Sequence, residues 1–391
     1  MKKKLDLSDF ENKKIALVLS GGVVKAAAWH LGVTLALEEL GFNFLTHGQE
    51  RGKKKLEIGT YVGSSAGTLV NALLAFGHSP KDYIYAAFRK KSKPGHIKAV
   101  GYKDFIHFEN PFSKNMFRDP GVSQDLPFVI RKLVSPLYNI PGFFSTQGLK
   151  QWLEREVLKT NSFTELDPDL FVVATQLDHT RKVIFSKYHY PNPSHDPTSE
   201  YYTQTSISDA MSASMSVPPF YKPYPIENTK TKETDYYIDG EIRETLSTHV
   251  AIDNGCEVII SSWTHSPYHF TPEIGSLANY GLPTICLQAI YLMIQKKIVA
   301  SRARIMQASD IIETVNDFMV KENFTDRQRK KLMSILERKL HHKRNIQFVD
   351  IYPSHNDYDV FFSNHFSLNP RLLSKVVNHG YKTSNLIFDR S

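Results

Sequence analysis

The chain of 391 residues is poor in cysteine and contains only two, Cys256 and Cys286. Two cysteines are too few for a disulfide framework, so the fold should not depend on oxidation. No group of cysteines and histidines has the spacing of zinc ligands, and we expect neither a metal nor a cofactor. The composition of the chain, 41% hydrophobic and 23% charged, is that of an ordinary globular protein.

Hydrophobic targeting and spanning segments are also missing. The chain begins with Met-Lys-Lys-Lys, but polar residues follow where a secretory signal would have its apolar core. Residues 274–295 carry no charge, yet Gly281 and Pro283 interrupt them. We therefore expect a buried or half-buried helix over 284–298 rather than a membrane span. The expected location is cytoplasmic or peripheral to a membrane, with export by a route without a signal peptide left open.

A glycine turn near the N-terminus is the first positive signal. Residues 15–19 form an apolar run typical of a strand buried on both faces. The turn Gly21-Gly22-Val23-Val24-Lys25 follows, and a helical pattern extends from Ala28 to Leu40. Such a turn directs backbone N–H groups at one spot, where the helix dipole favours negative charge. A phosphate loop is the competing interpretation, but the full P-loop and dinucleotide patterns are absent.

The most informative segment spans residues 58–69. An apolar run enters Gly63-Ser64-Ser65-Ala66-Gly67, and an apolar helical pattern leaves it. This is the strand, G-x-S-x-G and helix order of a nucleophile elbow, with Ser65 at the apex. Gly63 and Gly67 would leave space where the chain turns and the helix approaches the strand. Beside such a serine, the N–H groups of the first turn would form an oxyanion hole.

A third segment ends a short apolar strand with Asp239-Gly240. An Asp-Gly pair by itself usually marks a turn. Because the chain has 16 histidines, a Ser65, Asp239 and histidine triad is an alternative, with His249 or His265 as the base. An α/β-hydrolase needs several strands before its elbow, and this chain shows one clear strand before the elbow's own.

Together the three segments resemble the patatin-like phospholipase family. Its marks are a Gly-Gly-Gly-x-Lys/Arg-Gly loop, a G-x-S-x-G elbow and a later Asp-Gly-Gly/Ala, and the chain has counterparts at 21–26, 63–67 and 239–241 in that order. The resemblance covers roughly residues 14–262, and a weaker similarity lies near Gly380. It implies a Ser65–Asp239 dyad without histidine, an oxyanion hole at Gly21, Gly22, Val23 and Val24, and supporting roles for Lys25, Gly63, Gly67 and Gly240.

Two departures from the family pattern bear on activity. Val23 stands where the loop has its third glycine, and Ala26 where it has its last. If position 23 needs a positive φ, valine is strained there. Glu241 replaces a small residue next to Asp239, and this second carboxylate would either raise the pKa of Asp239 or point to solvent.

The resemblance implies a serine lipid acyl hydrolase of the phospholipase A or lysophospholipase type, acting through an acyl-enzyme on a phospholipid or another lipid ester. Two alternatives stay open. One is a catalytically impaired patatin-like protein that binds lipid or a partner, and the other is an acyltransferase.

Alternating strands and helices predict an α/β fold with a mostly parallel sheet covered on both faces. The resemblance adds a three-layer α/β/α sandwich. We expect a patatin-like domain over residues 14–262 and a mainly helical region over 263–391 packed on it.

The net charge of +8 is concentrated near the C-terminus. Residues 321–344 hold nine Lys or Arg against three Asp or Glu. Thr325 and Gln328 form a capping box, and one face of the helix that follows carries Leu332, Ile335, Leu336 and Leu340. Docking of this helix on the main domain is the favoured interpretation, and contact with an anionic membrane surface is the alternative. No nucleic-acid-binding module is apparent.

Overall fold

The central sheet has ten strands and is mostly parallel, as the sequence predicted. The computed structural model describes residues 5–88, 97–108, 127–134, 140–179, 181–190, 198–229, 231–340, 342–343 and 345–389. The path of the sheet is β10-β9-β1-β3-β4-β5-β6, with β2 on β3 and the hairpin β7-β8 attached to β4. The strands are β1 Ile15–Leu19, β2 Asn43–Phe44, β3 Glu57–Ser64, β4 Asp169–Gln176, β5 Lys182–Phe185, β6 Ser199–Tyr202, β7 Tyr224–Glu227, β8 Thr234–Asp239, β9 Val258–Ser262 and β10 Gln347–Ile351.

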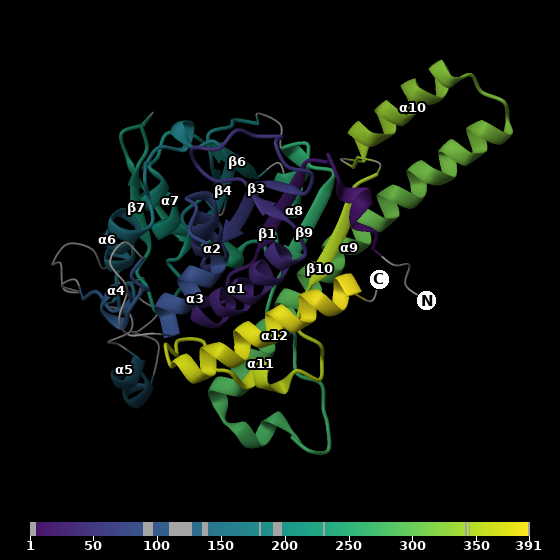
Figure 1. The fold of residues 1–391 in the computed structure, drawn as a ribbon. Coiled ribbons are helices and arrows are strands. Elements are labelled where there is room, and N and C mark those ends of the chain that lie inside the picture. The colour runs from purple at the N-terminus through teal and green to yellow at the C-terminus, as the bar shows by residue number, and fades with distance from the viewer. Residues whose placement is uncertain are drawn as a thin grey trace.

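Helices cover both faces of the sheet and complete a three-layer α/β/α sandwich (Figure 1). They are α1 Val23–Glu39, α2 Ala66–Ala75, α3 Pro80–Phe88, α4 Tyr102–Phe105, α5 Phe128–Val134, α6 Gln147–Glu156, α7 Ile207–Ser214, α8 Thr248–Asp253, α9 Leu282–Lys321, α10 Asp326–Lys339, α11 Tyr358–Phe362 and α12 Pro370–Asp389. Alternate residues of β1 enter two separate cores, because successive side chains of a strand point to opposite faces. Leu17 packs under α1, α2 and α12, while Val18 packs under α8 and the first half of α9.

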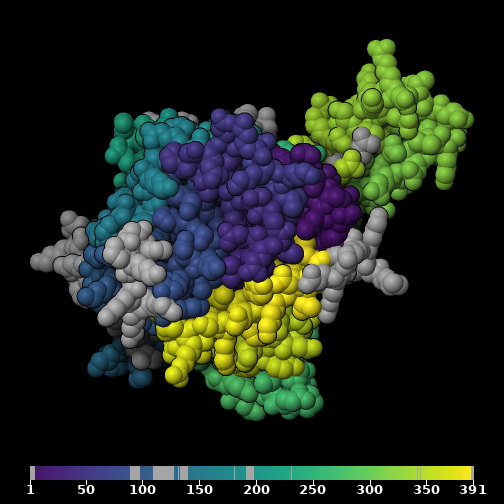
Figure 2. All heavy atoms as spheres, in the orientation of Figure 1, coloured from purple at the N-terminus to yellow at the C-terminus, as the bar shows by residue number. Residues whose placement is uncertain are grey.

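The C-terminal helix α12 lies directly on α1, as the contact between the yellow and purple surfaces shows (Figure 2). Glycine on each helix allows the close approach. A Cβ on Gly32 of α1 would lie 2.0 Å from the Val377 carbonyl oxygen, and a Cβ on Gly380 of α12 would lie 2.3 Å from the Trp29 carbonyl oxygen. The last part of the chain also supplies β10 to the sheet. A domain boundary at residue 262 stays a prediction.

Helices α9 and α10 form an arm that extends away from the body (Figure 1). The capping box at Thr325 and Gln328 is confirmed at the start of α10. The apolar face of α10 packs against α9 around Ile312, Met319 and Met333, whereas Ile335, expected on that face, is exposed at its edge. Helix α10 therefore docks on α9, and the expectation that it docks on the main domain is wrong. In the part of the chain that the structure describes, no helix combines the length and the apolar character that a bilayer crossing needs.

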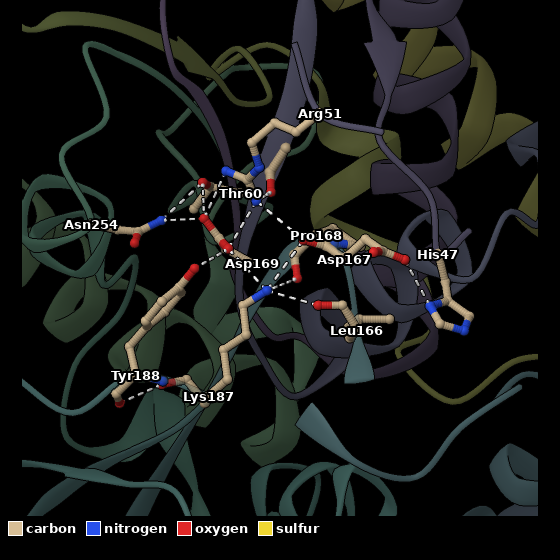
Figure 3. A network of polar contacts seen from close by, with 12 residues as sticks. His47, Arg51, Thr60, Leu166, Asp167, Pro168, Asp169, Lys187, Tyr188 and Asn254 are labelled. Atoms are coloured by element: carbon tan, nitrogen blue, oxygen red, sulfur yellow. Dashed lines mark hydrogen bonds and ion pairs between the residues drawn. The ribbon is translucent and has the colours of Figure 1, made fainter. Parts of the chain in front are cut away.

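A buried carboxylate ties together the amino-terminal edge of the sheet (Figure 3). Asp169 begins β4 and is inaccessible to solvent. Burial alone would raise its pKa, but hydrogen bonds and cations hold the pKa well below its usual range. Its partners are Lys14 at 3.4 Å, Arg51 at 2.9 Å, Lys187 at 3.3 Å, the Tyr188 hydroxyl at 2.8 Å and the Asn254 amide at 2.9 Å. One carboxylate thereby joins four otherwise separate segments.

We expect Asp169→Asn to lower the free energy of unfolding by about 3 kcal/mol at pH 7, because it leaves three cations without their counter-charge. A carboxyl group with a depressed pKa stabilises the fold above its unfolded-state pKa of about 3.9. The difference from wild type should therefore shrink as pH falls below about 4. Urea unfolding at pH 7 and pH 3.5 measures it. Asp167→Asn is the control, since Asp167 is half-exposed and should cost less than about 1 kcal/mol; an equal loss in both variants would contradict the central role of Asp169.

Candidate active site

Ser65 lies at the turn between β3 and α2, at the carboxyl edge of the sheet. Its φ of 50° and ψ of −123° are a strained conformation for a residue with a side chain. The two elbow glycines are sterically required. A Cβ on Gly63 would lie 2.6 Å from the Thr68 nitrogen, and one on Gly67 would lie 2.2 Å from the Leu19 carbonyl oxygen. The strand-turn-helix geometry expected from the sequence is therefore present.

A second serine supports the elbow, and the sequence did not single it out. The Ser65 N–H donates to Ser214 Oγ at 2.9 Å, and Ser214 in turn donates to the Val173 carbonyl at 2.6 Å. Ser214 is the last residue of α7 and is fully buried. This chain of hydrogen bonds fixes the strained turn to the centre of β4. No sequence pattern separates Ser214 from the other small residues of its helix.

Asp239 reaches Ser65 through strand pairing. β3 pairs with the first part of β4, up to Ser64 opposite Val173, and β8 pairs with the next residues, beginning with Asp239 opposite Ala174. The Ser65 hydroxyl therefore lies close enough to the Asp239 carboxylate to favour its ionised form. Burial raises the pKa of Asp239 to about 6, against the effect of the nearby Ser65 hydroxyl and of the hydrogen bond from the Glu241 N–H. The carboxylate can thus accept a proton near neutral pH.

The glycine loop has the geometry that strains its valine. Gly22 has a φ of 126° and Val23 a φ of 58° at the start of α1. A β-branched side chain in the left-handed region is unfavourable by about 1–2 kcal/mol. The loop therefore keeps a backbone suited to glycine although its third residue is valine. A Cβ on Gly21 would lie 2.8 Å from the Ser65 Cβ, so the loop and the elbow touch.

Glu241 points into this loop and not to solvent. Its Oε1 accepts the Gly21 N–H at 2.8 Å and the Ser64 hydroxyl. Gly240, between the two carboxylates, packs so tightly that a Cβ would lie 2.3 Å from the Val173 carbonyl oxygen. Two carboxyl groups therefore flank the serine.

Lys25 connects the loop helix to the C-terminal part of the chain. Its Nζ lies 2.6 Å from the Tyr291 hydroxyl and 3.1 Å from the Val360 carbonyl oxygen. Burial lowers its pKa to about 7. The His365 carbonyl accepts the Val24 N–H at 3.0 Å and the Lys25 N–H at 3.3 Å. Residues beyond 262 thus hold the start of α1 in place.

The candidate histidines are not between serine and aspartate. His249 lies on α8 with its Nδ1 3.5 Å from Glu244. His265 lies near the loop, 3.3 Å from where a Cβ on Gly22 would be, and burial lowers its pKa to about 3. His30 bonds Ser262 and the Ser20 carbonyl inside the core. None of the three has a hydrogen bond to Ser65 or Asp239 among the contacts of the described residues.

An apolar cavity of about 920 Å³, including its open mouth, adjoins Ser65. The walls come from α1, α2, α3, α4 and α6, from the segment after α7, and from the C-terminal segment. They include Ala27, Leu31, Leu69, Phe105, Leu149, Met215, Leu373 and Val377. Within the described ranges, no cluster of three or more His, Cys, Asp or Glu side chains is placed to hold a metal ion.

The three-layer α/β/α fold, with a serine elbow and a glycine loop at the carboxyl edge of its sheet, defines an α/β protein with a candidate acyl-transfer site. A family model described as patatin-like phospholipase matches residues 17–252, more than half of the chain. The chain therefore belongs to the patatin-like phospholipase family, which in general has lipid acyl hydrolase activity. No curated protein matches the chain.

Proposed function

We propose that this protein is a serine lipid acyl hydrolase of the phospholipase A or lysophospholipase type, with Ser65 as nucleophile and Asp239 as general base. The observation that carries the proposal is the strand register, which sets Ser65 beside the Asp239 carboxylate at the mouth of the apolar cavity. Family membership supports the lipid substrate class.

In the proposed reaction, Ser65 Oγ attacks the ester carbonyl carbon while its proton passes to Asp239. The carbonyl electron pair moves onto oxygen, beside the N–H groups of the glycine loop. The alcohol then leaves with the proton from Asp239, and an acyl-Ser65 ester remains. Water, deprotonated by Asp239, attacks that ester and releases the fatty acid. An alcohol in place of water would give the acyltransferase alternative.

The cavity is suited to the acyl chain. Its walls are aliphatic and aromatic, and Ser65 is part of its lining. Burial of each methylene from water stabilises a bound chain by about 0.8 kcal/mol. A chain lying along α1 would place its ester near the elbow. The cavity thus supports a substrate with a long acyl chain over a short-chain ester.

Removal of the dyad should abolish turnover and leave the fold intact. We expect Ser65→Ala to lose fluorophosphonate labelling and Asp239→Asn to lower kcat for a lipid ester by about 10²–10⁴-fold, as for loss of a general base. Neither variant should melt at lower temperature at pH 8, because Asp239→Asn removes a buried charge. His249→Ala and His265→Ala are the controls.

In wild type, kcat/KM should fall as pH drops below about 6, where Asp239 takes up a proton. Full hydrolysis by purified Ser65→Ala would refute the nucleophile. A histidine variant as inactive as Asp239→Asn would instead support a triad.

The cavity can be tested by filling it. Ala27 lines the cavity from α1, and Ala27→Phe would occupy part of the space. We expect kcat/KM for long-chain esters to fall at least tenfold relative to a four-carbon ester. Ala300→Phe, on the exposed side of α9, is the matched control and should not change this ratio. An unchanged chain-length profile for Ala27→Phe would place the acyl chain elsewhere.

We further propose that the α9–α10 arm contacts anionic lipid through its tip. Phe318, Val320 and Phe324 are 58%, 49% and 41% exposed there. The surrounding stretch carries the surplus of basic residues, which complements an anionic surface. Since the apolar face of α10 is used against α9, the tip rather than that face would enter the bilayer.

Reversing Lys330 and Lys331 to Glu should weaken binding to anionic vesicles at least tenfold, since each basic residue contributes about 1 kcal/mol. Hydrolysis of a short soluble ester should be unaffected. Co-sedimentation with anionic and neutral vesicles across a salt series measures this. The same reversal at Lys53 and Lys54, exposed on the body, is the control. Equal binding by wild type and the Lys330/Lys331 variant would leave the arm without this role.

A further inference from the structure

A third side chain, that of Glu241, reaches the site of the proposed Ser65 and Asp239 pair. A Cβ placed on Gly21 would lie 2.6 Å from the Glu241 Cγ and 2.8 Å from the Ser65 Cβ. The glutamate side chain and the nucleophile therefore meet at the same point of the glycine loop. At this position the family pattern has glycine or alanine, which could not reach the loop.

The hydrogen bonds of the loop show how Glu241 interferes with it. Gly21 donates its N–H to Glu241 Oε1 at 2.8 Å, and Val24 donates its N–H to the His365 carbonyl at 3.0 Å. Among the described residues, the N–H groups of Gly22 and Val23 have no such acceptor. Two of the four expected oxyanion donors are thus occupied by the protein itself, one of them by a carboxylate.

We propose that the Glu241 carboxylate is a built-in inhibitor of this site, which occupies the Gly21 N–H and opposes the negative charge that forms on the substrate oxygen. The inference rests on the proposed function, since it concerns the oxyanion of the same reaction. When Ser65 Oγ bonds to the carbonyl carbon, the carbonyl electron pair moves to oxygen, and the serine proton goes to Asp239. The new charge then lies close to a second carboxylate, and their repulsion raises the barrier.

Protonation of Glu241 would relieve this repulsion. Burial, and then the charge of Asp239, raise the pKa of Glu241 to about 7, while hydrogen bonds from Ser64 and Gly21 oppose the shift. Oε2 is buried and has no hydrogen-bond partner in the described structure, although the Thr245 hydroxyl lies near enough to favour the ionised form.

The elements around Glu241 also carry Lys25 on α1, His265 after β9, Arg243 beside Glu241, and Lys297 of α9, which bonds the Ile242 carbonyl. Glu244 follows on the same segment and pairs with Lys182 and His249. Burial keeps His265 neutral near pH 7. Asp239 is the ionised neighbour that shifts Glu241. The inhibition should therefore be weak below about pH 7 and strong above it, while activity still requires ionised Asp239.

The test is a pH series of kcat for wild type, Glu241→Ala and Glu241→Gln from pH 5.5 to 9. Glu241→Ala restores a small residue and frees the Gly21 N–H, and removal of one oxyanion donor typically costs 10²–10³-fold. We expect Glu241→Ala to raise kcat at least tenfold at pH 8, with a smaller change in KM. Glu241→Gln keeps the shape without the charge and should lose the fall in kcat above pH 7. Glu313→Gln, exposed on α9, is the matched control and should follow wild type.

The outcomes separate the inhibitory role of Glu241 from the hydrolase proposal. An alkaline limb kept unchanged in Glu241→Gln, or a kcat for folded Glu241→Ala no higher than wild type at pH 8, would overturn the inhibitory role while leaving the hydrolase proposal in place. If Glu241→Ala melts below the assay temperature, the inhibitory role is judged from Glu241→Gln alone, by whether its kcat still falls above pH 7. If neither wild type nor any Glu241 variant reacts with fluorophosphonate at any pH, the hydrolase proposal fails and the inference with it.

Discussion

The candidate site depends on a change of partner along one edge of β4. The first residues of β4 pair with parallel β3, which ends at Ser64, and the next pair with antiparallel β8, which ends at Asp239. Two strands that approach from opposite directions thus end at the same point, one carrying the serine and the other the aspartate. Gly240 and the Ser214 bridge fill the junction so closely that neither strand can shift without breaking a buried contact.

The pKa values of the two buried aspartates on this sheet are shifted in opposite directions, because different numbers of cations and hydrogen-bond donors surround them. Asp169 is surrounded by an amide, a phenol and three cations, so the gain from its charge exceeds the cost of burial and its pKa falls. Asp239 accepts one backbone N–H, has the Ser65 hydroxyl nearby and has no cation beside it among the causes of its shift, and burial raises its pKa to about 6. The first arrangement stabilises the fold. The second keeps a carboxylate that can take up a proton at neutral pH, at a cost in stability.

The C-terminal part of the chain, beyond the residues that match the family, completes the surroundings of the site. Helix α12 closes the apolar cavity through Leu373 and Val377, and the His365 carbonyl binds the first N–H groups of α1. Lys25 joins the same structure through Tyr291 and Val360. Acyl-chain preference and the shape of the glycine loop are therefore expected to respond to changes far along the sequence from Ser65.

The sequence by itself determined the local elements: the α/β class, the elbow at Ser65, the glycine loop and the capped helix after Thr325. These follow from short-range sterics and periodicity, and the structure contains all of them. The sequence left open whether Val23 is strained and where Glu241 points, and only the tertiary structure decided both, with a φ of 58° and a hydrogen bond to Gly21. The roles of Ser214 and His365 were not foreseen, because both act through contacts between segments more than 100 residues apart. Such contacts are set by packing, and packing leaves no local pattern in the chain.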